Sequence, residues 1–342
     1  LSMLISLLEK QTPLIDVRAP IEFKKGSLPT SVNLPILLDD ERHQVGKTYK
    51  KLGSGPATDL GFNLVSGDLK EKRVKKWLNF INDNPSAQIY CARGGQRSKI
   101  AQEWIAEQGV SVPKVEGGFK SLRNECLNFI DKACSDEKKW IVIAGMTGTN
   151  KTGIISLLNN GIDLEGLANH RGSAFGGFET PQPSPIDFEN SLACNYIQIK
   201  NKTVIFEDES RTIGRLVIPE KFYNRIINSE IVIINEPIDV RVDHIYEEYV
   251  HDALVNQTND DLKRKLSDQL SKISKRLGRD NFIKINEQLQ IAFQKDSRES
   301  HHIWIHELLT NYYDKMYYYQ LEKKKDRCIF SGSWKEVKKY FI

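Results

Sequence analysis

The chain has 342 residues, of which 39% are apolar and 27% are charged. This length allows two or three domains with separate cores, and the composition is typical of an ordinary soluble protein. No apolar run approaches the roughly 20 residues of a membrane span, and the N-terminus lacks the basic region and cleavage site of a signal peptide. The five cysteines form neither C-x-x-C pairs nor a disulfide ladder. We therefore expect reduced thiols, a cytoplasmic protein and no membrane partner.

The first predicted elements precede and follow a cysteine. Residues 15–18 (IDVR) and 26–35 (GSLPTSVNLP) open the chain, with the acidic residue Glu22 between them. Further on, residues 87–90 (AQIY) predict a short strand, and apolar residues at helical spacing after position 98 predict a helix. Cys91 therefore lies at a strand-to-helix turn.

Cys91 begins the glycine-rich loop 91–98 (CARGGQRS). Loop N–H groups and the positive end of the following helix stabilise an anion, and Arg93 and Arg97 add positive charge. Such surroundings lower the pKa of a thiol. A lone cysteine is usually a buried packing residue. A cysteine followed by two glycines and two arginines instead predicts a reactive thiolate.

This loop resembles the active-site loop of rhodanese domains, which carry sulfur or selenium as a cysteine persulfide or perselenide. The segments 15–18 and 26–35 and the residue Glu22 look like the strand, turn and acidic residue of the same fold. The resemblance implies a rhodanese-like domain over residues 1–132.

A second site follows the predicted strand 140–144 (WIVIA). Residues 145–152 (GMTGTNKT) nearly match the P-loop pattern G-x-x-x-x-G-K-[ST], and apolar residues over 154–158 open a helix after it. In such a loop the backbone N–H groups hold phosphate oxygens, Lys151 neutralises their charge, and the Thr152 hydroxyl reaches Mg²⁺.

One residue of this loop departs from the pattern. Gly145 and Gly148 are present, but Asn150 stands where the pattern has its second glycine. Asparagine tolerates left-handed backbone geometry better than other non-glycine residues, so the turn is expected to form. We expect phosphate binding, whereas the identity of the phosphate ligand and the hydrolysis of a nucleotide stay open.

Two later segments extend this site. The predicted strand 203–206 (TVIF) ends in Glu207 and Asp208, which predict a Mg²⁺ site together with Thr152. An ordinary charged strand end is the alternative. Between the loop and this strand, the polar segment 163–178 contains His170 and Arg171, which are candidates for binding a phosphate or diphosphate. His170 is also a candidate acid or base, although a lone loop histidine is usually neither.

The C-terminal third is basic and helical. Residues 251–342 carry 18 Lys and Arg against 13 Asp and Glu. Apolar residues repeat at helical spacing over 261–277, Gly278 ends the helix, and the basic residues between them suit RNA or form a solvated helix face. The tyrosines of this region could stack on an extruded base, but packing is the commoner role at this spacing; they are Tyr312, Tyr313, Tyr317, Tyr318 and Tyr319.

Several ordered motifs together resemble the bacterial tRNA 2-selenouridine synthase family. Besides the two loops, these are ILLDDERHQVGKTYKKLG at 36–53, VEGGFKSLR at 115–123, DLEGLANHRGSAFG at 163–176 and FEDESRTIG at 206–214. The resemblance continues to residues 304–324. It implies an α/β fold with an N-terminal rhodanese-like domain over 1–132, a P-loop NTPase-like domain over 138–248 and a helical, basic region over 249–342 that could contact tRNA.

The resemblance also implies an activity. The family converts wobble 2-thiouridine to 2-selenouridine in the tRNAs for lysine, glutamate and glutamine. Geranyl diphosphate first alkylates the sulfur, and selenium from selenophosphate then replaces the S-geranyl group. Selenophosphate would come from a partner enzyme, the tRNA would bind through its anticodon stem-loop, and no cofactor would be tightly bound.

Roles for individual residues follow from the same resemblance. Cys91 would carry selenium as a perselenide, and the groups binding the selenophosphate or stabilising the anion would be Arg93, Arg97, Gly94 and Gly95. The groups gripping the geranyl diphosphate or a tRNA phosphate would be Gly145, Gly148, Lys151 and Thr152. The place of the geranyl chain cannot be located from these motifs. A rhodanese-type tRNA sulfurtransferase and a nucleotide-driven binding switch are the alternatives.

Overall fold

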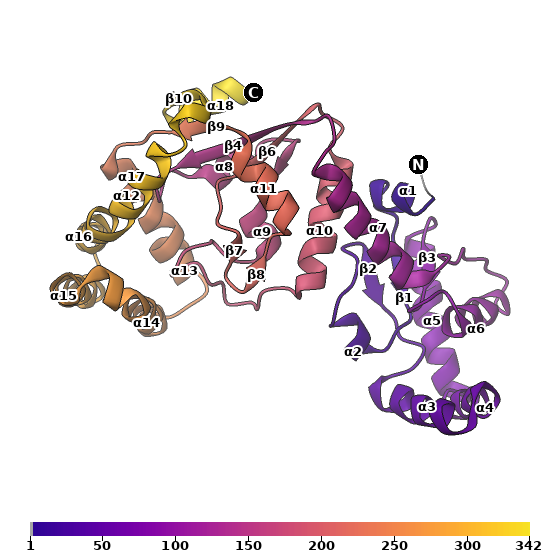
Figure 1. Cartoon of the computed structure of the whole chain (residues 1–342). Coiled ribbons are helices and arrows are strands. Elements are labelled where there is room, and N and C mark those ends of the chain that lie inside the picture. The colour runs from indigo at the N-terminus through magenta and orange to yellow at the C-terminus, as the bar shows by residue number, and fades with distance from the viewer. Residues whose placement is uncertain (1–2) are drawn as a thin grey trace. The chain divides into compact units, whose positions relative to one another are not determined.

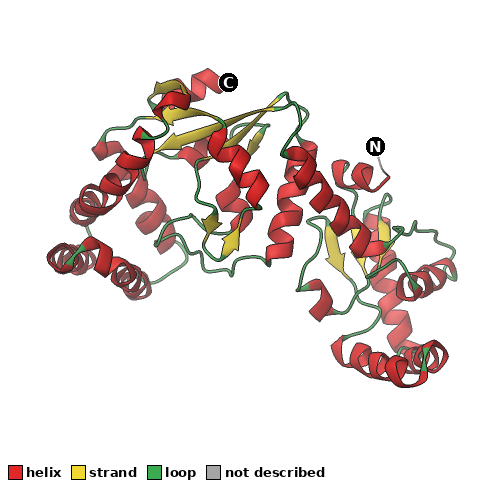
Figure 2. Cartoon of the chain, viewed as in Figure 1, coloured by secondary structure: helices red, strands yellow, loops and turns green. Residues whose placement is uncertain are grey.

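The computed structural model describes residues 3–342, which divide into two compact units (Figure 1). The first unit extends to Ser135 and also includes Pro183–Gln198. The second unit comprises Asp136–Gln182 and Ile199–Ile342. Helices dominate both units, and the strands are confined to small sheets (Figure 2).

A three-stranded parallel sheet forms the centre of the first unit, in the order β2-β1-β3. Its strands are β1 (Leu14–Asp16), β2 (Ser31–Asn33) and β3 (Gln88–Tyr90). The central strand β1 is completely buried, as expected for a parallel sheet covered on both faces. The helices of this unit are α1 (Met3–Glu9), α2 (Pro20–Phe23), α3 (Asp39–Leu52), α4 (Ser54–Leu64), α5 (Gly67–Asp83), α6 (Gln96–Ala106), α7 (Gly118–Ala133) and α10 (Pro185–Gln198).

Helix α10 is distant in sequence from the rest of its unit but is held there by specific contacts. Arg123 on α7 donates a hydrogen bond of 2.9 Å to Asn190, whose own amide donates to the carbonyl of Ser27 at 2.7 Å. The rings of Phe129 and Tyr196 pack edge to face at 6.1 Å between centroids. These contacts bury the apolar face of α10 against α7.

The second unit is built on a five-stranded parallel sheet in the order β10-β9-β4-β6-β5. The strands are β4 (Lys139–Gly145), β5 (Gly161–Ile162), β6 (Thr203–Glu207), β9 (Glu230–Ile234) and β10 (Cys328–Gly332), and β7 (Thr212–Ile213) pairs separately with β8 (Leu216–Val217). The P-loop follows the central strand β4. Ligands of such sheets bind beyond the carboxyl ends of the strands, which places the candidate phosphate site there.

Helices cover this sheet and extend beyond it. They are α8 (Lys151–Ile155), α9 (Leu164–Ala168), α11 (Glu220–Asn228), α12 (Ile238–Tyr246), α13 (Asp252–Leu254), α14 (Asn259–Leu277), α15 (Arg279–Lys295), α16 (Arg298–Leu308), α17 (Asp314–Glu322) and α18 (Trp334–Phe341). Two π-helical turns, Glu247–His251 and Leu309–Tyr313, and a 3₁₀ turn at Lys325–Arg327 interrupt them.

The apolar stripe expected over 261–277 is core. All five of its residues are at most 4% exposed: Leu262, Leu266, Leu270, Ile273 and Leu277. Gly278 ends α14 with a φ of 85°, a conformation that glycine adopts without strain. The tyrosines considered for base stacking differ in their exposure to solvent. Tyr312 and Tyr313 are buried, whereas Tyr318 and Tyr319 are more than 60% exposed.

The α/β fold with a rhodanese-like and a P-loop part is confirmed. The two units differ in two places from the expected segments 1–132, 138–248 and 249–342. Residues 183–198 belong with the first unit because α10 buries its apolar face there. The region after 249 includes β10, which pairs with β9 and completes the P-loop sheet. Within the described residues, no helix is both long and apolar enough to cross a bilayer.

Candidate functional site

Cys91 is held at the end of β3 and is 3% exposed. Its Sγ lies 3.2 Å from Oγ of Ser98, in the first turn of α6, and the carbonyl oxygen of Gly95 lies 3.0 Å from the same Oγ, so the single hydroxyl proton is shared between the sulfur and this carbonyl. Ser98 is completely buried. The sulfur therefore has one defined polar neighbour and a restricted approach from solvent.

A second glycine-rich segment supports the cysteine loop. The backbone N–H of Phe119 donates to the carbonyl of Cys91 at 2.9 Å, and that of Lys120 donates to the next carbonyl. Gly118 has a φ of 58°, and a Cβ there would lie 2.2 Å from the Cys91 carbonyl oxygen. Gly94 has a φ of 65°, and a Cβ there would lie 2.8 Å from the backbone nitrogen of Gly117. Only glycine permits this contact between the two loops, which explains the VEGG sequence at 115–118.

The environment of Cys91 favours a thiolate. Burial alone raises the pKa of the thiol, but hydrogen bonds from the Ser98 side chain and from the backbone of Ser98 and Arg93, with the charge of Arg97, lower it below its ordinary value. Arg97 is fixed by Glu22 through contacts of 2.5 and 3.1 Å. Of the loop residues predicted to bind an anion, Arg93 and Gly95 are exposed.

The P-loop of the second unit forms despite its asparagine. Asn150 has φ 55° and ψ 49°, which is left-handed geometry, and its side chain accepts a hydrogen bond of 3.0 Å from the N–H of Gly153. Gly148 has a φ of 85°, and a Cβ there would lie 2.7 Å from the Arg241 carbonyl oxygen. Asn150 thus replaces the glycine of the pattern and also caps α8, so the expected turn is present.

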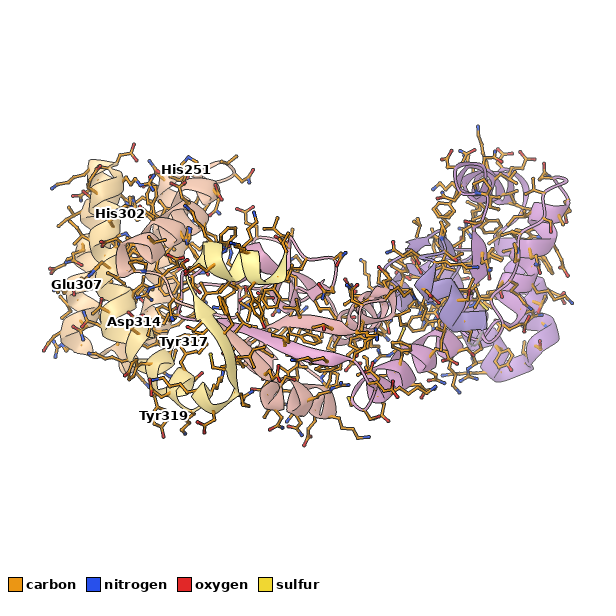
Figure 3. The ribbon with its side chains drawn as sticks, turned by 90° about the horizontal axis from the view of Figure 1, so that it is seen from above. His251, His302, Glu307, Asp314, Tyr317 and Tyr319 are labelled. Carbon is orange, nitrogen blue, oxygen red and sulfur yellow. The ribbon has the colours of Figure 1, made fainter. Side chains whose placement is uncertain are left out.

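Two side chains of helix α12 contact backbone carbonyls of the P-loop. The buried guanidinium of Arg241 donates to the carbonyl of Thr147 at 3.2 Å and forms two bonds to Asp314, of 2.8 and 2.7 Å. Nδ1 of His244 lies 2.9 Å from the carbonyl oxygen of Gly148. Asp314 and Tyr317 follow each other along α17 (Figure 3), so the C-terminal helices share in forming this site.

Carboxylates converge on the start of α8. Oγ1 of Thr152 donates to Glu207 at 2.6 Å and to Glu165 at 3.3 Å. Burial and the charge of Glu165 raise the pKa of Glu207 well above its ordinary value. Burial and neighbouring carboxylates likewise raise the pKa of Glu165 to about 8 and that of Glu209 to about 7. These three acids lie close to each other and repel one another.

Asp208 takes a different position from the one predicted. Its two oxygens accept from Nζ of Lys324, each at 2.6 Å, whereas Glu207 contacts Thr152. The structure brings Glu165 and Glu209, rather than Asp208, next to Glu207. Alternate residues of an extended chain end point in opposite directions, which separates positions 207 and 208.

The donor set fits a Mg²⁺ ion that is shared with a phosphate. Among residues 3–342, no group of three His, Cys, Asp or Glu side chains is arranged to hold a metal by itself. Mg²⁺ commonly takes only one or two carboxylates and completes its shell with water and substrate phosphate. Thr152 and Glu207 could supply the protein ligands, and the cation would relieve the repulsion that raises the carboxyl pKa values.

A polar pocket with an empty volume of about 930 Å³ opens in front of the P-loop. Lys151 and Arg171 line it with positive charge. Arg171 pairs with Glu248 at 2.5 Å and lies over the rings of Phe178 and Tyr249. His170 is not among the lining residues; its Nδ1 accepts from the N–H of Gly172 at 3.1 Å, and burial lowers its pKa. Of the predicted pair, the structure therefore brings Arg171 to the pocket.

An apolar pocket with an empty volume of about 360 Å³ adjoins the polar one. The two share four lining residues, namely Thr147, Ser173, Ile245 and Tyr249. The apolar pocket continues between helices α14 and α16, where Phe175, Leu266 and Trp304 line it. Both π-helical turns contribute side chains, Tyr249 from one and Tyr313 from the other, and such turns are frequent at functional sites.

Several residues of this site were not predicted from the sequence. Glu165, Glu209, Glu248 and Tyr249 line the polar pocket, and so does Tyr317, which the sequence indicated only as a stacking or packing residue. Glu165 and Glu209 belong to segments that the motifs already included, DLEG and FEDES, and an acid within a glycine-rich segment would have been a usable signal. Glu248 and Tyr249 lie in a helix without a recognisable pattern.

Comparison with known proteins agrees with the two-part architecture of the chain. A family model described as "tRNA 2-selenouridine synthase AAA domain" matches residues 138–342, and a model of the rhodanese-like domain matches residues 2–125. The curated tRNA 2-selenouridine synthase of Nitrosomonas europaea is 42% identical and covers 98% of this chain and 96% of its own. The protein of that name from Sulfurovum sp. is 41% identical over the same shares, and that from Shewanella frigidimarina is 42% identical over 95% of this chain and 93% of its own.

Proposed function

Because this chain belongs to the tRNA 2-selenouridine synthase family, we propose that it replaces the sulfur of wobble 2-thiouridine by selenium in the tRNAs for lysine, glutamate and glutamine. It is a tRNA-modifying transferase. The observation that carries the finer proposal is the presence, in one chain, of a cysteine with a lowered thiol pKa and a P-loop pocket that adjoins an apolar one.

The first step is S-alkylation by geranyl diphosphate in the second unit. The P-loop amides and Lys151 hold the diphosphate, with Arg171 beside them, and the adjoining apolar pocket accommodates the prenyl chain. The thiocarbonyl sulfur of the base forms a bond to C1 of the geranyl group, and diphosphate leaves with the electron pair of the broken C–O bond. Thr152 and Glu207 would hold a Mg²⁺ ion, which would supply positive charge to the leaving diphosphate.

The second step exchanges the S-geranyl group for selenium in the first unit. Alkylation turns the sulfur into a good leaving group and makes C2 of the base open to a selenium nucleophile. The Cys91 thiolate forms a bond to the selenium of selenophosphate, which a partner enzyme supplies, and the Se–P bond breaks with its electron pair on phosphorus, so that Cys91 carries selenium as a perselenide. After this selenium has bonded to C2, a thiol co-reactant forms a disulfide with Cys91 and releases the selenium with the electron pair of the S–Se bond. The loop amides and Arg97 stabilise the anion.

The tRNA contacts the basic helix α14. Lys272, Lys275, Arg276 and Arg279 are all exposed on it or directly after it. Cations of this kind neutralise backbone phosphates, and the exposed Tyr318 and Tyr319 offer rings for stacking. Binding of an anticodon stem-loop should therefore weaken as salt concentration rises.

The experiment that tests this function uses a 2-thiouridine-bearing anticodon stem-loop. It is incubated with the protein, geranyl diphosphate and Mg²⁺, then with selenophosphate, and its nucleosides are analysed by mass spectrometry after each stage. A geranyl mass gain followed by replacement with selenium is expected. An unchanged base at both stages would refute the function, and labelling of Cys91 by sulfur from thiosulfate alone would favour a sulfurtransferase. Hydrolysis of ATP or GTP stimulated by tRNA would favour a nucleotide switch.

A further inference from the structure

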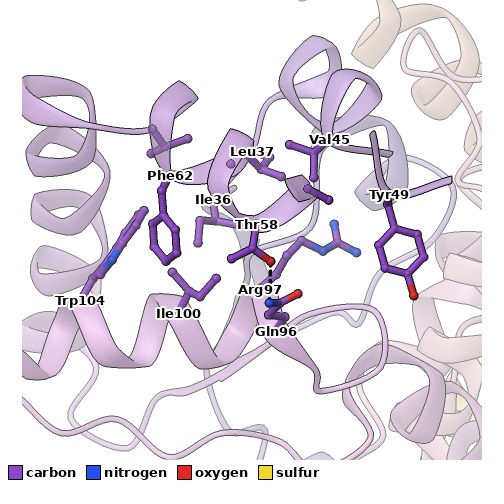
Figure 4. A pocket seen from close by; sticks show the side chains of 13 residues that line it. Ile36, Leu37, Val45, Tyr49, Thr58, Phe62, Gln96, Arg97, Ile100 and Trp104 are labelled. Carbon is purple, nitrogen blue, oxygen red and sulfur yellow. Dashed lines mark hydrogen bonds between the residues drawn. The ribbon is translucent and has the colours of Figure 1, made fainter. Parts of the chain in front are cut away.

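The first unit has an apolar pocket of its own beside the cysteine loop. It lies between helices α3, α4 and α6 and opens to solvent (Figure 4). Most of the side chains that line it are apolar. The apolar lining residues are Ile36, Leu37, Val45, Ala57, Phe62, Val65, Ile100 and Trp104.

Polar groups occur where the pocket meets the cysteine loop. Nε2 of Gln96 donates to Oγ1 of Thr58 at 2.8 Å, and the side chain of Arg97 passes along the same side toward Tyr49 (Figure 4). Gln96 and Arg97 are the first two residues of α6 and directly follow the loop of Cys91. The pocket is therefore apolar inside and is bordered by the amide of Gln96 and by the guanidinium of Arg97, which pairs with Glu22.

Cys91 and the pocket share one packed core. Cys91 belongs to the same cluster of buried side chains as Ile36, Leu37 and Trp104, which line the pocket. Arg97 also acts electrostatically on the Cys91 thiol. The pocket and the sulfur are thus connected through the side chains of one core, although Cys91 itself does not line the pocket.

Large apolar side chains at the open side of the pocket are exposed to solvent. Tyr49 is 60% exposed and Phe62 is 42% exposed, although both line the pocket. Leu38 and Leu52, at the two ends of α3, are 47% and 67% exposed. A group of exposed apolar side chains around a concave apolar site indicates an apolar ligand.

We propose that this pocket binds the prenyl chain of the S-geranyl base while selenium replaces its sulfur. This inference rests on the proposed function and adds a recognition site to its second step. The reacting carbon C2 is one bond from the sulfur that carries the chain, so the chain must lie within its own length of the Cys91 loop. The pocket is an apolar site lined by residues of α6, the helix that directly follows this loop.

The chemistry explains what the pocket contributes. A selenium nucleophile forms a bond to C2, the C2–S bond breaks with its electron pair on sulfur, and the geranylthiolate takes a proton and leaves. Binding the chain positions C2 and places the leaving group in apolar surroundings. It also selects the alkylated base over unmodified 2-thiouridine, whose sulfur carries no chain to bury.

The structure offers a matched pair of variants. Gly61 on α4 lines the pocket, and a Cβ there would meet only Cγ2 of Val45 at 3.9 Å. Gly46 on α3 is exposed outside the pocket, and a Cβ there would meet nothing within 4 Å. Neither glycine has a positive φ, and leucine favours helix over glycine, so both variants should fold. Gly61→Leu fills the pocket, whereas Gly46→Leu leaves it open.

The test measures binding of two synthetic stem-loops, one with S-geranyl-2-thiouridine and one with S-methyl-2-thiouridine, to the full chain without a selenium donor. We expect the wild type and Gly46→Leu to bind the S-geranyl RNA at least about tenfold more tightly, because several more carbon atoms are buried. Gly61→Leu should bind both RNAs alike. Equal binding of both RNAs by the wild type would overturn the inference, as would a preference that survives Gly61→Leu, since the apolar pocket of the second unit would then hold the chain.

Selenation of presynthesised S-geranyl RNA provides a second measurement. In single turnovers Gly61→Leu should be at least about tenfold slower than Gly46→Leu, whereas transfer of geranyl from geranyl diphosphate should agree within about twofold. Equal selenation rates in the two variants would count against the pocket. Both RNAs are made chemically, so absence of geranyl transfer in every variant would refute only the first step of the proposed function.

Discussion

Around Cys91 the polar neighbours are hydrogen-bond donors and a guanidinium, whereas carboxylates gather at the P-loop. The first arrangement lowers the pKa of its thiol, and the second raises the pKa values of Glu165, Glu207 and Glu209. The cysteine site can therefore stabilise an anion with the groups of its own unit. At the P-loop the three acids with raised pKa values outnumber Lys151 and Arg171, and Arg171 already pairs with Glu248, so under the proposed function a bound cation would help to hold the diphosphate.

The largest effect is expected for Cys91→Ala. Loss of the thiolate should lower the rate of selenation by at least about a thousandfold, as is usual when a covalent nucleophile is removed. Geranyl transfer should stay within about twofold of the wild type, because Cys91 belongs to the other unit. Nucleoside mass spectrometry measures both steps. Persistence of both in the variant would show that Cys91 has no catalytic role.

Lys151→Ala should slow geranyl transfer rather than selenation. Removing a cation that faces the diphosphate should slow geranyl transfer by about a hundredfold to a thousandfold, comparable with loss of one stabilising donor. Selenation of presynthesised S-geranyl RNA should be unchanged. Normal geranyl transfer in this variant would place the diphosphate elsewhere, and a matching loss of selenation would mean that the two sites do not act separately.

Ser98→Ala tests how the cysteine loop lowers the thiol pKa. The hydroxyl lies 3.2 Å from Sγ, and its removal should raise the pKa of Cys91 toward its ordinary value. A thiol with a lowered pKa becomes a thiolate at lower pH, so the midpoint of alkylation by iodoacetamide should move to higher pH in the variant. At neutral pH the alkylation rate should fall by about threefold to tenfold, in proportion to the thiolate fraction. Identical pH profiles of wild type and variant would mean that the loop amides and Arg97, and not Ser98, lower the pKa of the Cys91 thiol.

The smallest effect is expected at Asn150. Asn150→Gly loses the cap on Gly153 but relieves the left-handed strain, so the free energy of unfolding should change by less than about 0.5 kcal/mol. Asn150→Ala keeps the strain and loses the cap, which should cost about 1–2 kcal/mol. Thermal denaturation of the two variants side by side checks this order. A more stable alanine variant would contradict the role given to the side chain.

Much of each loop was predictable because it depends on neighbouring residues. The strand-to-helix turn at Cys91, the tolerance of Asn150 for its turn and the buried stripe of α14 follow from local spacing and backbone preference. Predictions that required a side-chain direction were less successful. Asp208 pairs with Lys324, 116 positions away, and His170 binds within its own loop.

The sequence by itself determined which chemical groups this protein has and the order in which they occur, because glycine-rich loops, caps and helical stripes act over a few residues. Only the tertiary structure decided which acids surround Thr152 and that α10 packs with the first unit. It also decided that each unit contains an apolar pocket. These features need contacts between segments that are far apart in the chain. Such contacts are selected by the packing of whole helices and strands, and no local pattern records them.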